Sequence, residues 1–332
     1  MNDWQLAWNH GKVTVQPLGG MVDIEFQLPS GKTVSPMYRA PWIGEPTGAD
    51  VPAMLQRLRG DWFCVPFGAG HPVPGLTTRW KNVGEPEAGG LVHGYGSHHN
   101  WSILHLSQSE MTVTIEYPQN HPVKRLERTI RPMPGEPAVR FDLSVEARDN
   151  VSLPIGLHPT FRMPAEPGAI RLKPGGFSFG LTYPGDFEPG AFMLKPDSLF
   201  DTIEKVETRD LNRIDLSRLP LEGDSETLVQ LCGIDGRFDL INEKEKYGIR
   251  IQWIPEHFPS CAIWISNRGR KYAPWNGRNL AVGIEPVCSA FELGTAVSKK
   301  TNPISESGFS TCVSFKAGEV WRTQYSIGAV KA

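Results

Sequence analysis

Apolar and polar residues alternate over short stretches of the chain, and turns containing Gly or Pro separate these stretches. The alternation is cleanest at Val22–Phe26, Met111–Tyr117 and Val139–Glu146, and it has the two-residue period of a strand with one buried face. Lys124–Arg131 is polar on one face, which predicts an edge strand or a solvated strand. Short connections such as Met133–Glu136 predict a meander of antiparallel hairpins.

Helical patterns are nearly absent. The best candidate is Val51–Arg59, with Pro52 near its first turn and Gly60 at its end. Residues 69–90 are rich in Gly and Pro and predict a long irregular loop. Further strands are expected at Ile249–Trp253, Cys261–Ile265, Val313–Phe315 and Gln324–Ile327. We therefore expect an all-β fold, a large two-sheet antiparallel β-sandwich. Because no linker divides the chain, we expect a single domain over residues 1–332.

Two apolar strands each deliver a titratable residue directly before a proline. In Leu280–Cys288 it is Glu285, and because Pro286 cannot donate to a sheet ladder, we expect the strand to end or to reach an edge there. In Leu153–Arg162 it is His158, followed by Pro159. A lone Glu or His in such a place is more often a solvated rim residue or a hydrogen-bonded core residue. The shared pattern favours a paired acid/base role, because a partly desolvated carboxylate can act as a general base.

Four histidines lie close together in the sequence, at His93, His98, His99 and His105. Clustered histidines can bind a metal ion. Their spacing matches no ligand template and no acidic ligand falls in place, so we expect no metal.

The composition excludes several functional classes. The 332 residues carry a net charge of −2 with mixed signs and no long basic block, so we expect no nucleic-acid partner. No apolar run is long enough to span a bilayer, and the first ten residues lack the pattern of a signal peptide. The five cysteines are odd in number and widely spread, which favours reduced thiols and a cytoplasmic location. Nothing in the sequence selects an oligomeric state.

Four short motifs follow one another along the chain: Leu91–Gly94, Gly156–Phe161, Ile234–Phe238 and Ile284–Pro286. In order and spacing they resemble the landmarks of the galactose mutarotase (aldose 1-epimerase) superfamily. The resemblance implies a large antiparallel β-sandwich with an open sugar-binding cleft, and an isomerase that interconverts the α and β anomers of an aldose.

The resemblance also implies roles for single residues. Glu285 would be the general base for the anomeric hydroxyl, and His158 the general acid for the ring oxygen. His93 and Asp235 would hold sugar hydroxyls. No metal or organic cofactor would be needed, and the partner would be a small-molecule sugar. We further expect an ionised Glu285, which would push the nearby His158 toward its protonated form.

The chain departs from the pattern of the superfamily in two places. The substrate-binding arginine usually follows a proline in an Asn-Arg-Ile segment, whereas this chain has Val65–Gly70 there. Arg59 is a candidate substitute because it is near in sequence. The usual His-Pro-Tyr is replaced by His158-Pro-Thr.

The sequence leaves four functions open. The first is epimerisation of a free aldose. The second is epimerisation of a phosphorylated or acidic sugar, held by cations of the loop before the Glu285 strand. The third is sugar binding or sensing without catalysis, and the fourth is a metal-dependent reaction using the clustered histidines. The loop cations are Arg268, Arg270, Lys271 and Arg278; alternatively, they belong to a solvated loop.

Overall fold

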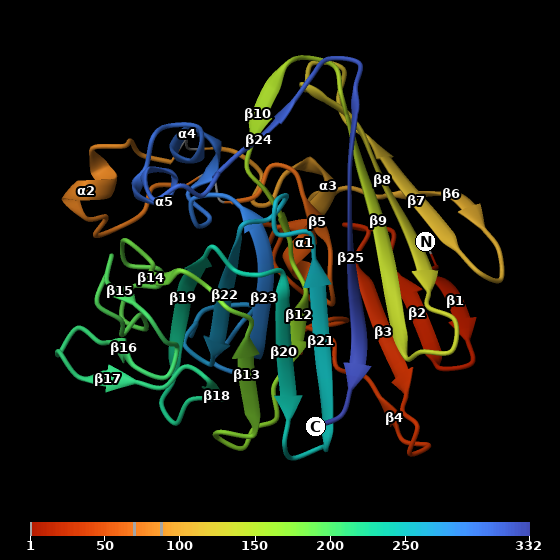
Figure 1. Cartoon of the computed structure of the whole chain (residues 1–332), viewed down its shortest axis with the longest axis horizontal. Helices are drawn as coiled ribbons and strands as arrows, with labels where there is room; N and C mark the ends of the chain where they lie inside the picture. Colours follow the sequence, from red (N-terminus) through yellow and green to blue (C-terminus); the bar gives the residue numbers. More distant parts are fainter. Residues whose placement is uncertain (1, 69–70, 87–88) are drawn as a thin grey trace.

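The computed structural model describes residues 2–68, 71–86 and 89–332. The regular structure of these residues consists mostly of antiparallel strands (Figure 1). The strands are β1 Trp4–Trp8, β2 Gly11–Val15, β3 Val22–Gln27, β4 Thr33–Val34, β5 Phe63–Cys64, β6 Ser102–Leu106, β7 Met111–Glu116, β8 Val123–Pro132, β9 Ala138–Ala147, β10 Val151–Leu153, β11 Ile155–Leu157, β12 Thr160–Arg162, β13 Ile170–Pro174, β14 Phe179–Thr182, β15 Leu199–Phe200, β16 Val206–Glu207, β17 Arg213–Ile214, β18 Arg218–Leu219, β19 Ser225–Cys232, β20 Arg237–Asn242, β21 Tyr247–Trp253, β22 Ser260–Asn267, β23 Leu280–Cys288, β24 Val313–Phe315 and β25 Val320–Val330. The helices are α1 Ala53–Gln56, α2 Thr78–Lys81, α3 Tyr95–His98, α4 Gly294–Ser298 and α5 Pro303–Glu306.

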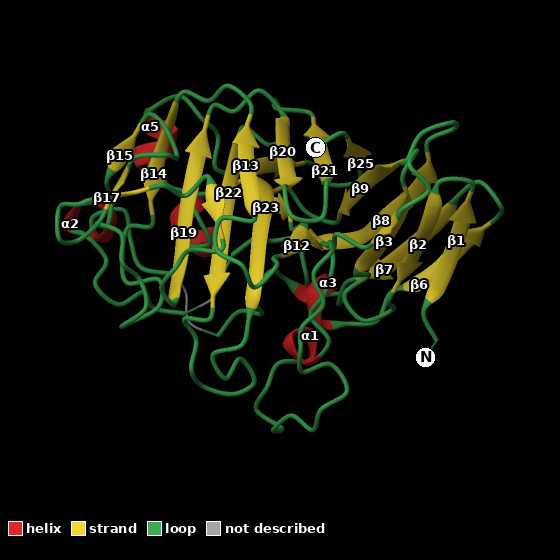
Figure 2. Ribbon diagram, turned by 90° about the horizontal axis from the view of Figure 1, so that it is seen from below, coloured by secondary structure: helices red, strands yellow, loops and turns green. Residues whose placement is uncertain are grey.

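Two large antiparallel sheets form the layers of a sandwich (Figure 2). One has eight strands, with the order β15-β14-β19-β22-β23-β11-β5 and β12 beside β23. The other has nine strands, with the order β18-β13-β20-β21-β25-β9-β8-β7-β6. The N-terminal strands form a separate sheet of four, β1-β2-β3-β4. The prediction of an all-β antiparallel sandwich is confirmed.

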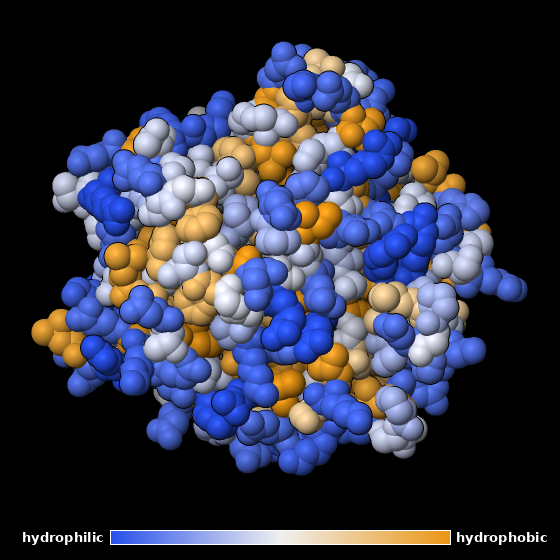
Figure 3. Space-filling view, viewed as in Figure 1, coloured by the Kyte–Doolittle hydropathy of each residue, from blue (hydrophilic) through white to orange (hydrophobic). Residues whose placement is uncertain are grey.

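The hydrophobic alternation of the sequence sets the two faces of each strand. In β9, Val139, Phe141, Leu143 and Val145 are buried, and the residues between them are not. Buried apolar side chains from all three larger sheets join in one cluster. On the face seen in Figure 3, polar residues predominate, with smaller groups of apolar residues among them.

Strand β8 agrees with only one of the two alternatives predicted for Lys124–Arg131. It is not an edge strand, because it lies between β7 and β9. One of its faces does reach solvent, through the partly exposed Arg125, Glu127, Thr129 and Arg131. Its inward face includes Arg128, whose guanidinium is buried and pairs with the carboxylate of Asp61 and the hydroxyl of Tyr325. A buried charge is tolerated when it is paired in this way. Arg128 therefore belongs to the buried face of β8 although it is charged.

The predicted helix at Val51–Arg59 shrinks to one turn, α1. Its first residue follows Pro52, no side chain caps its start, and Arg57 leaves the helical conformation. Such short helices are marginal without tertiary support. The predicted loop at 69–90 contains α2; residues 69–70 and 87–88 lie outside the described residues. No helix in the described ranges is both long and apolar enough to cross a membrane.

Strand β23 does not end at Pro286, so that prediction is wrong. It continues to Cys288 inside its sheet, with Cys261 of β22 opposite Pro286. Ile284 donates its N–H to Pro159, on the other side of β23. Since N–H groups two residues apart point to the same side of a strand, the missing N–H of Pro286 also falls on that side. There the neighbouring strand is interrupted between β11 and β12, so no ladder bond is lost.

Candidate active site

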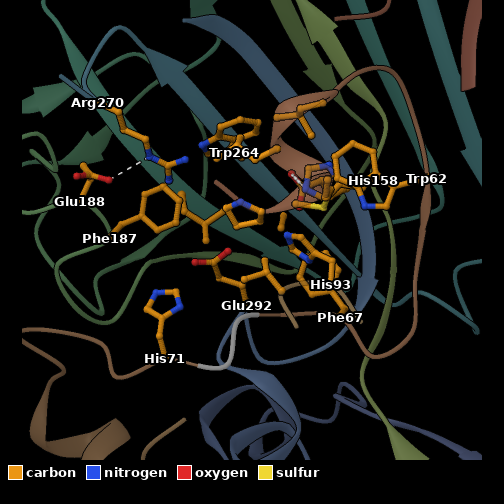
Figure 4. A pocket seen from close by; sticks show the side chains of 18 of the residues that line it. Trp62, Phe67, His71, His93, His158, Phe187, Glu188, Trp264, Arg270 and Glu292 are labelled. Atoms are coloured by element: carbon orange, nitrogen blue, oxygen red, sulfur yellow. Dashed lines mark hydrogen bonds and ion pairs between the residues drawn. The ribbon is translucent and has the colours of Figure 1, made fainter. Parts of the chain in front are cut away.

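A cavity of about 320 Å³ opens above the eight-stranded sheet, which is a size typical of small-molecule sites. Strands β19, β22 and β23 contribute to its floor through Leu228, Trp264 and Glu285. Figure 4 shows Trp62 and His158 at one end and Arg270, Glu188 and Phe187 at the other. The lining combines large aromatic faces with a few polar groups, which is the composition expected for a sugar site.

Glu285 projects from the middle of β23 and is buried. The neighbouring strands fix its backbone: Glu285 lies opposite Ala262 of β22, and Gly283 lies opposite Thr160 of β12. Its side chain bends over Gly283, where a Cβ atom would overlap Oε1 and come within 3.1 Å of Cδ. Glycine at this position is therefore what leaves room for the carboxyl group.

His158 lies at the break between β11 and β12, and its position is fixed on three sides. Its backbone N–H donates to the carbonyl of Trp62 over 3.0 Å. Its ring stacks on that of Trp62, with the centroids 3.9 Å apart and 15° between the planes. Its Nδ1 lies 3.1 Å from the hydroxyl of Thr160, which itself donates to the carbonyl of His158. Thr160 therefore accepts from Nδ1–H, and Nε2 is left to exchange a proton.

Nε2 of His158 lies 3.4 Å from Oε1 of Glu285. No described residue makes a hydrogen bond to that oxygen. The two titratable residues that the sequence singled out before prolines are thus brought together in one cavity.

Burial dominates the proton equilibria of this pair. It raises the pKa of Glu285 well above its ordinary value, and the nearby carboxyl of Glu292 raises it further. It lowers the pKa of His158 well below its ordinary value, and His93 adds to that effect. Both shifts run against the expectation of an ionised Glu285 beside a protonated His158. Each group favours its neutral form because desolvation penalises charge.

His93 also reaches the cavity. Its backbone has a positive φ of 60°, and its N–H donates to the carbonyl of Gly68 over 2.8 Å. Nδ1 of His93 accepts from the N–H of Gly68 over 3.4 Å, so the proton of the neutral ring sits on Nε2. Burial lowers the pKa of His93 to about 3. His93 is thus a neutral hydrogen-bond donor.

Two of the residues selected from the sequence do not reach the cavity. Asp235 lies in an exposed turn, where its carboxylate accepts from the N–H of Gly176 over 3.0 Å. Arg59 is buried elsewhere and donates to Asp3 over 2.6 Å. Neither belongs to the lining of this cavity.

The four clustered histidines do not converge. His93 and His98 line the cavity, His99 stacks on Tyr95, and His105 is exposed beside Glu110. Within residues 2–68, 71–86 and 89–332, no group of three His, Cys, Asp or Glu side chains is arranged to hold a metal ion.

Several polar residues of the cavity were missed or only partly seen in the sequence. Glu188 and Glu292 belong to loops, where no hydrophobic period marks them. Arg270 had been considered only as one of several cations for an anionic substrate. Burial raises the pKa of Glu292 to about 7. The basic, aromatic loop before β23 is a sequence signal for Arg270 alone, and Glu188 and Glu292 have none.

The chain is similar over its whole length to solved structures. With the aldose epimerase homologue from C. elegans it shares 11% identity, with 100% of this chain and 99% of that chain covered and a TM-score of 0.64. With a galactose mutarotase-like protein from Clostridium acetobutylicum the identity is 12%, the coverage is 99% and 95%, and the TM-score is 0.63. With a galactose mutarotase related enzyme from Lactobacillus acidophilus the identity is 14%, the coverage is 99% and 98%, and the TM-score is 0.58.

In sequence, no family model matches the chain, and no match is found among curated proteins. At such low identity the structural likeness concerns the fold. It agrees with the resemblance carried by the four motifs: the chain has the fold of the galactose mutarotase (aldose 1-epimerase) superfamily.

Proposed function

We propose that this protein is an aldose 1-epimerase-type isomerase, which interconverts the α and β anomers of an aldose. The observation that carries the proposal is the pair formed by Glu285 and His158, 3.4 Å apart in an aromatic cavity. Mutarotation needs one group that takes the proton of O1 and another that gives a proton to O5, and because both oxygens are bonded to C1, two neighbouring groups can serve them.

The proposed reaction uses these groups in the following way. Glu285 takes the proton of the anomeric hydroxyl O1 while His158 gives a proton to the ring oxygen O5. The C1–O5 bond breaks and a carbonyl forms at C1. After rotation about the C1–C2 bond, the reverse transfers close the ring as the other anomer. His93 donates from Nε2 to a sugar oxygen, and Trp62 keeps the ring of His158 in position.

The pair must carry one proton in total. We place that proton on Glu285 in the free site, because burial shifts the pKa values of both residues toward their neutral forms. A sugar hydroxyl that donates to Oε1 stabilises the carboxylate. The proton then moves to Nε2 of His158, which produces the base and the acid that the ring opening uses.

The test is anomer exchange measured by NMR on a panel of aldoses, their 6-phosphates and uronic acids. Glu285→Gln and His158→Asn should each reduce exchange by about 10²- to 10⁴-fold, the usual contribution of a positioned acid or base. Asp235→Asn is the matched control, because Asp235 lies in an exposed turn. It should retain the wild-type rate.

Three outcomes would contradict the proposal in different ways. Exchange that survives both substitutions would mean that other residues carry the chemistry. Binding of a sugar without exchange would favour a sensing protein. Exchange lost in Asp235→Asn would show that the turn approaches the substrate.

A further inference from the structure

The guanidinium of Arg270 lies at the end of the cavity away from Glu285 and His158 (Figure 4). Its Nε donates to Oε2 of Glu188 over 3.0 Å and lies 3.8 Å from Oε2 of Glu226. The hydroxyl of Tyr272 also donates to Glu188, over 3.1 Å. Arg270 therefore has two carboxylate partners. One of them, Glu188, is also held by Tyr272, which lines the cavity.

A buried network behind the cavity wall holds Glu226. The hydroxyl of Ser266 donates to its Oε1 over 2.7 Å, and Nε1 of Trp264 lies 3.3 Å from its Oε2. Asn279 in turn donates to Ser266 over 2.8 Å. Glu226 is fully buried, and a buried carboxylate with this many donors is a fixed element. Arg270 is thus anchored to the β-sheet as well as to its loop.

Aromatic rings fix the plane of the guanidinium. Its Cζ lies 4.7 Å from the ring centre of Trp275, 5.5 Å from that of Phe187 and 5.7 Å from that of Trp264. Cation–π contacts of this kind attract the charge while leaving the N–H groups in the plane available.

The outer nitrogens of Arg270 are available for a ligand. In the described part of the chain, Arg270 donates hydrogen bonds only from Nε, and neither Nη1 nor Nη2 has a protein acceptor. A guanidinium carries five N–H groups, so four remain. The side chain lines the cavity and is only 17% exposed. These N–H donors are preorganised, because Glu188, Glu226 and the aromatic rings hold the guanidinium in place.

Acidic side chains already surround Arg270. Glu188 and Glu226 lie against the guanidinium, and Glu292 lines the same cavity. The other cations of the loop pair elsewhere and are absent from the described lining. These pairs are Arg268 with Asp224, Lys271 with Asp224, and Arg278 with Glu45.

We propose that Arg270 is the specificity-determining residue of this cavity: its Nη groups bind the hydroxyls of the aldose farthest from the anomeric carbon, and its carboxylate partners make the site select uncharged sugars over phosphorylated or acidic ones. This proposal rests on the proposed epimerase function. It gives the loop of Arg270 the role of binding the end of the sugar away from Glu285 and His158. From the sequence alone, this loop was a candidate for binding an anionic substrate.

The first experiment separates binding from chemistry. In Arg270→Gln, kcat/KM for D-glucose and D-galactose anomer exchange should fall by about 10- to 100-fold, mostly through KM, because the lost hydrogen bonds hold the sugar throughout the reaction. Arg270→Lys should recover only part of the loss, since lysine keeps the charge but not the planar fork. Arg278→Gln is the control and should match the wild type. Wild-type KM values in Arg270→Gln would overturn the proposal.

The second experiment tests charge selection. Wild-type protein should process D-glucose at least ~10-fold more efficiently than glucose 6-phosphate or glucuronate. Glu188→Gln keeps an acceptor oxygen for Nε but removes one negative charge. In this variant, the ratio of kcat/KM for D-glucose to kcat/KM for the anionic sugars should fall by roughly 10-fold. A wild-type preference for glucose 6-phosphate, or an unchanged preference in Glu188→Gln, would contradict the proposal.

Failure of this proposal can be told apart from failure of the epimerase function. Exchange that depends on Glu285 and His158 but not on Arg270 would reject only the role of Arg270. If wild-type protein catalyses no exchange, quenching of tryptophan fluorescence by the same sugars still tests Arg270, because Trp264 and Trp275 lie beside it. Sugar binding that is equal in wild type and Arg270→Gln, or no sugar binding at all, would overturn it.

Discussion

Replacing Gly283 by alanine should displace the carboxyl group of Glu285 while leaving the sheet intact. The added Cβ would overlap Oε1 of Glu285 and would lie 3.1 Å from Cδ and 3.3 Å from Cγ. Ordinary carbon–carbon contacts are about 3.5–4.0 Å. The backbone cannot yield easily, because Gly283 is opposite Thr160 on one side and Trp264 on the other. The carboxyl group must therefore move, by about 1 Å.

The magnitude of the effect follows from that displacement. A 1 Å error in the position of a catalytic group can cost about 10²-fold in rate, which corresponds to ~2.7 kcal/mol of activation free energy. Stability should change little, because alanine is preferred over glycine in a strand by about 0.5–1 kcal/mol and this gain offsets part of the strain. We expect a melting temperature within ~4 °C of the wild type.

The assay is NMR anomer exchange on the best substrate, together with thermal unfolding of the same samples. Gly223→Ala is the control, because a Cβ there meets nothing within 4 Å. It should leave both exchange and melting unchanged. Wild-type exchange in a folded Gly283→Ala protein would refute the reasoning, since the reaction would then not depend on where the carboxyl group of Glu285 lies.

Three further predictions concern stability and metal dependence. Burial raises the pKa of Glu292 from 4.5 to about 7. Between these two pH values the folded state keeps a proton that the unfolded chain loses. The free energy of unfolding should therefore fall by up to ~3 kcal/mol as the pH rises from about 4.5 to about 7. Glu292→Gln should therefore resist urea better than the wild type at about pH 8 and equally at about pH 4, and equal resistance at both would contradict this. Asp61→Asn should cost about 3–5 kcal/mol in urea unfolding, because it leaves the buried charge of Arg128 without its partner; a loss below ~1 kcal/mol would contradict this. EDTA should not change anomer exchange, and a loss that added Zn²⁺ restores would contradict the placement of the histidines.

The pairing of Glu285 with His158 could be anticipated in part: Glu285 lies on the regular strand β23, and His158 lies at the break between β11 and β12, which both pair with β23. Each residue ends an apolar run before a proline, and the antiparallel pairing of β11 and β12 with β23 then places the two side chains beside each other. The alternating pattern likewise predicts β7 and β9 closely. In a regular strand the two-residue period fixes the direction of each side chain, so that direction can be predicted from the sequence.

The distal half of the cavity could not be anticipated in this way. Arg270 and Glu188 belong to loops, whose direction depends on contacts far away in the sequence, such as their own bond across 82 positions. Glu226 lies on β19, where every residue is buried and no polar face stands out. Asp235 is the reverse case, a residue selected from the sequence that lies outside the cavity. Its Asp-Gly turn is recognisable in the sequence, but the sequence does not say which way the turn faces.

Burial links the stability of this site to its chemistry. Oε1 of Glu285 is buried and accepts no hydrogen bond from a described residue, and an unsatisfied buried acceptor typically costs about 1–3 kcal/mol. In the proposed function, an anomeric hydroxyl supplies the missing donor. The same hydrogen bond favours the carboxylate over the carboxylic acid, so the substrate both relieves the cost and moves the shared proton toward His158. In the proposed function, therefore, the site gains its active protonation state only when the group that will react is in place.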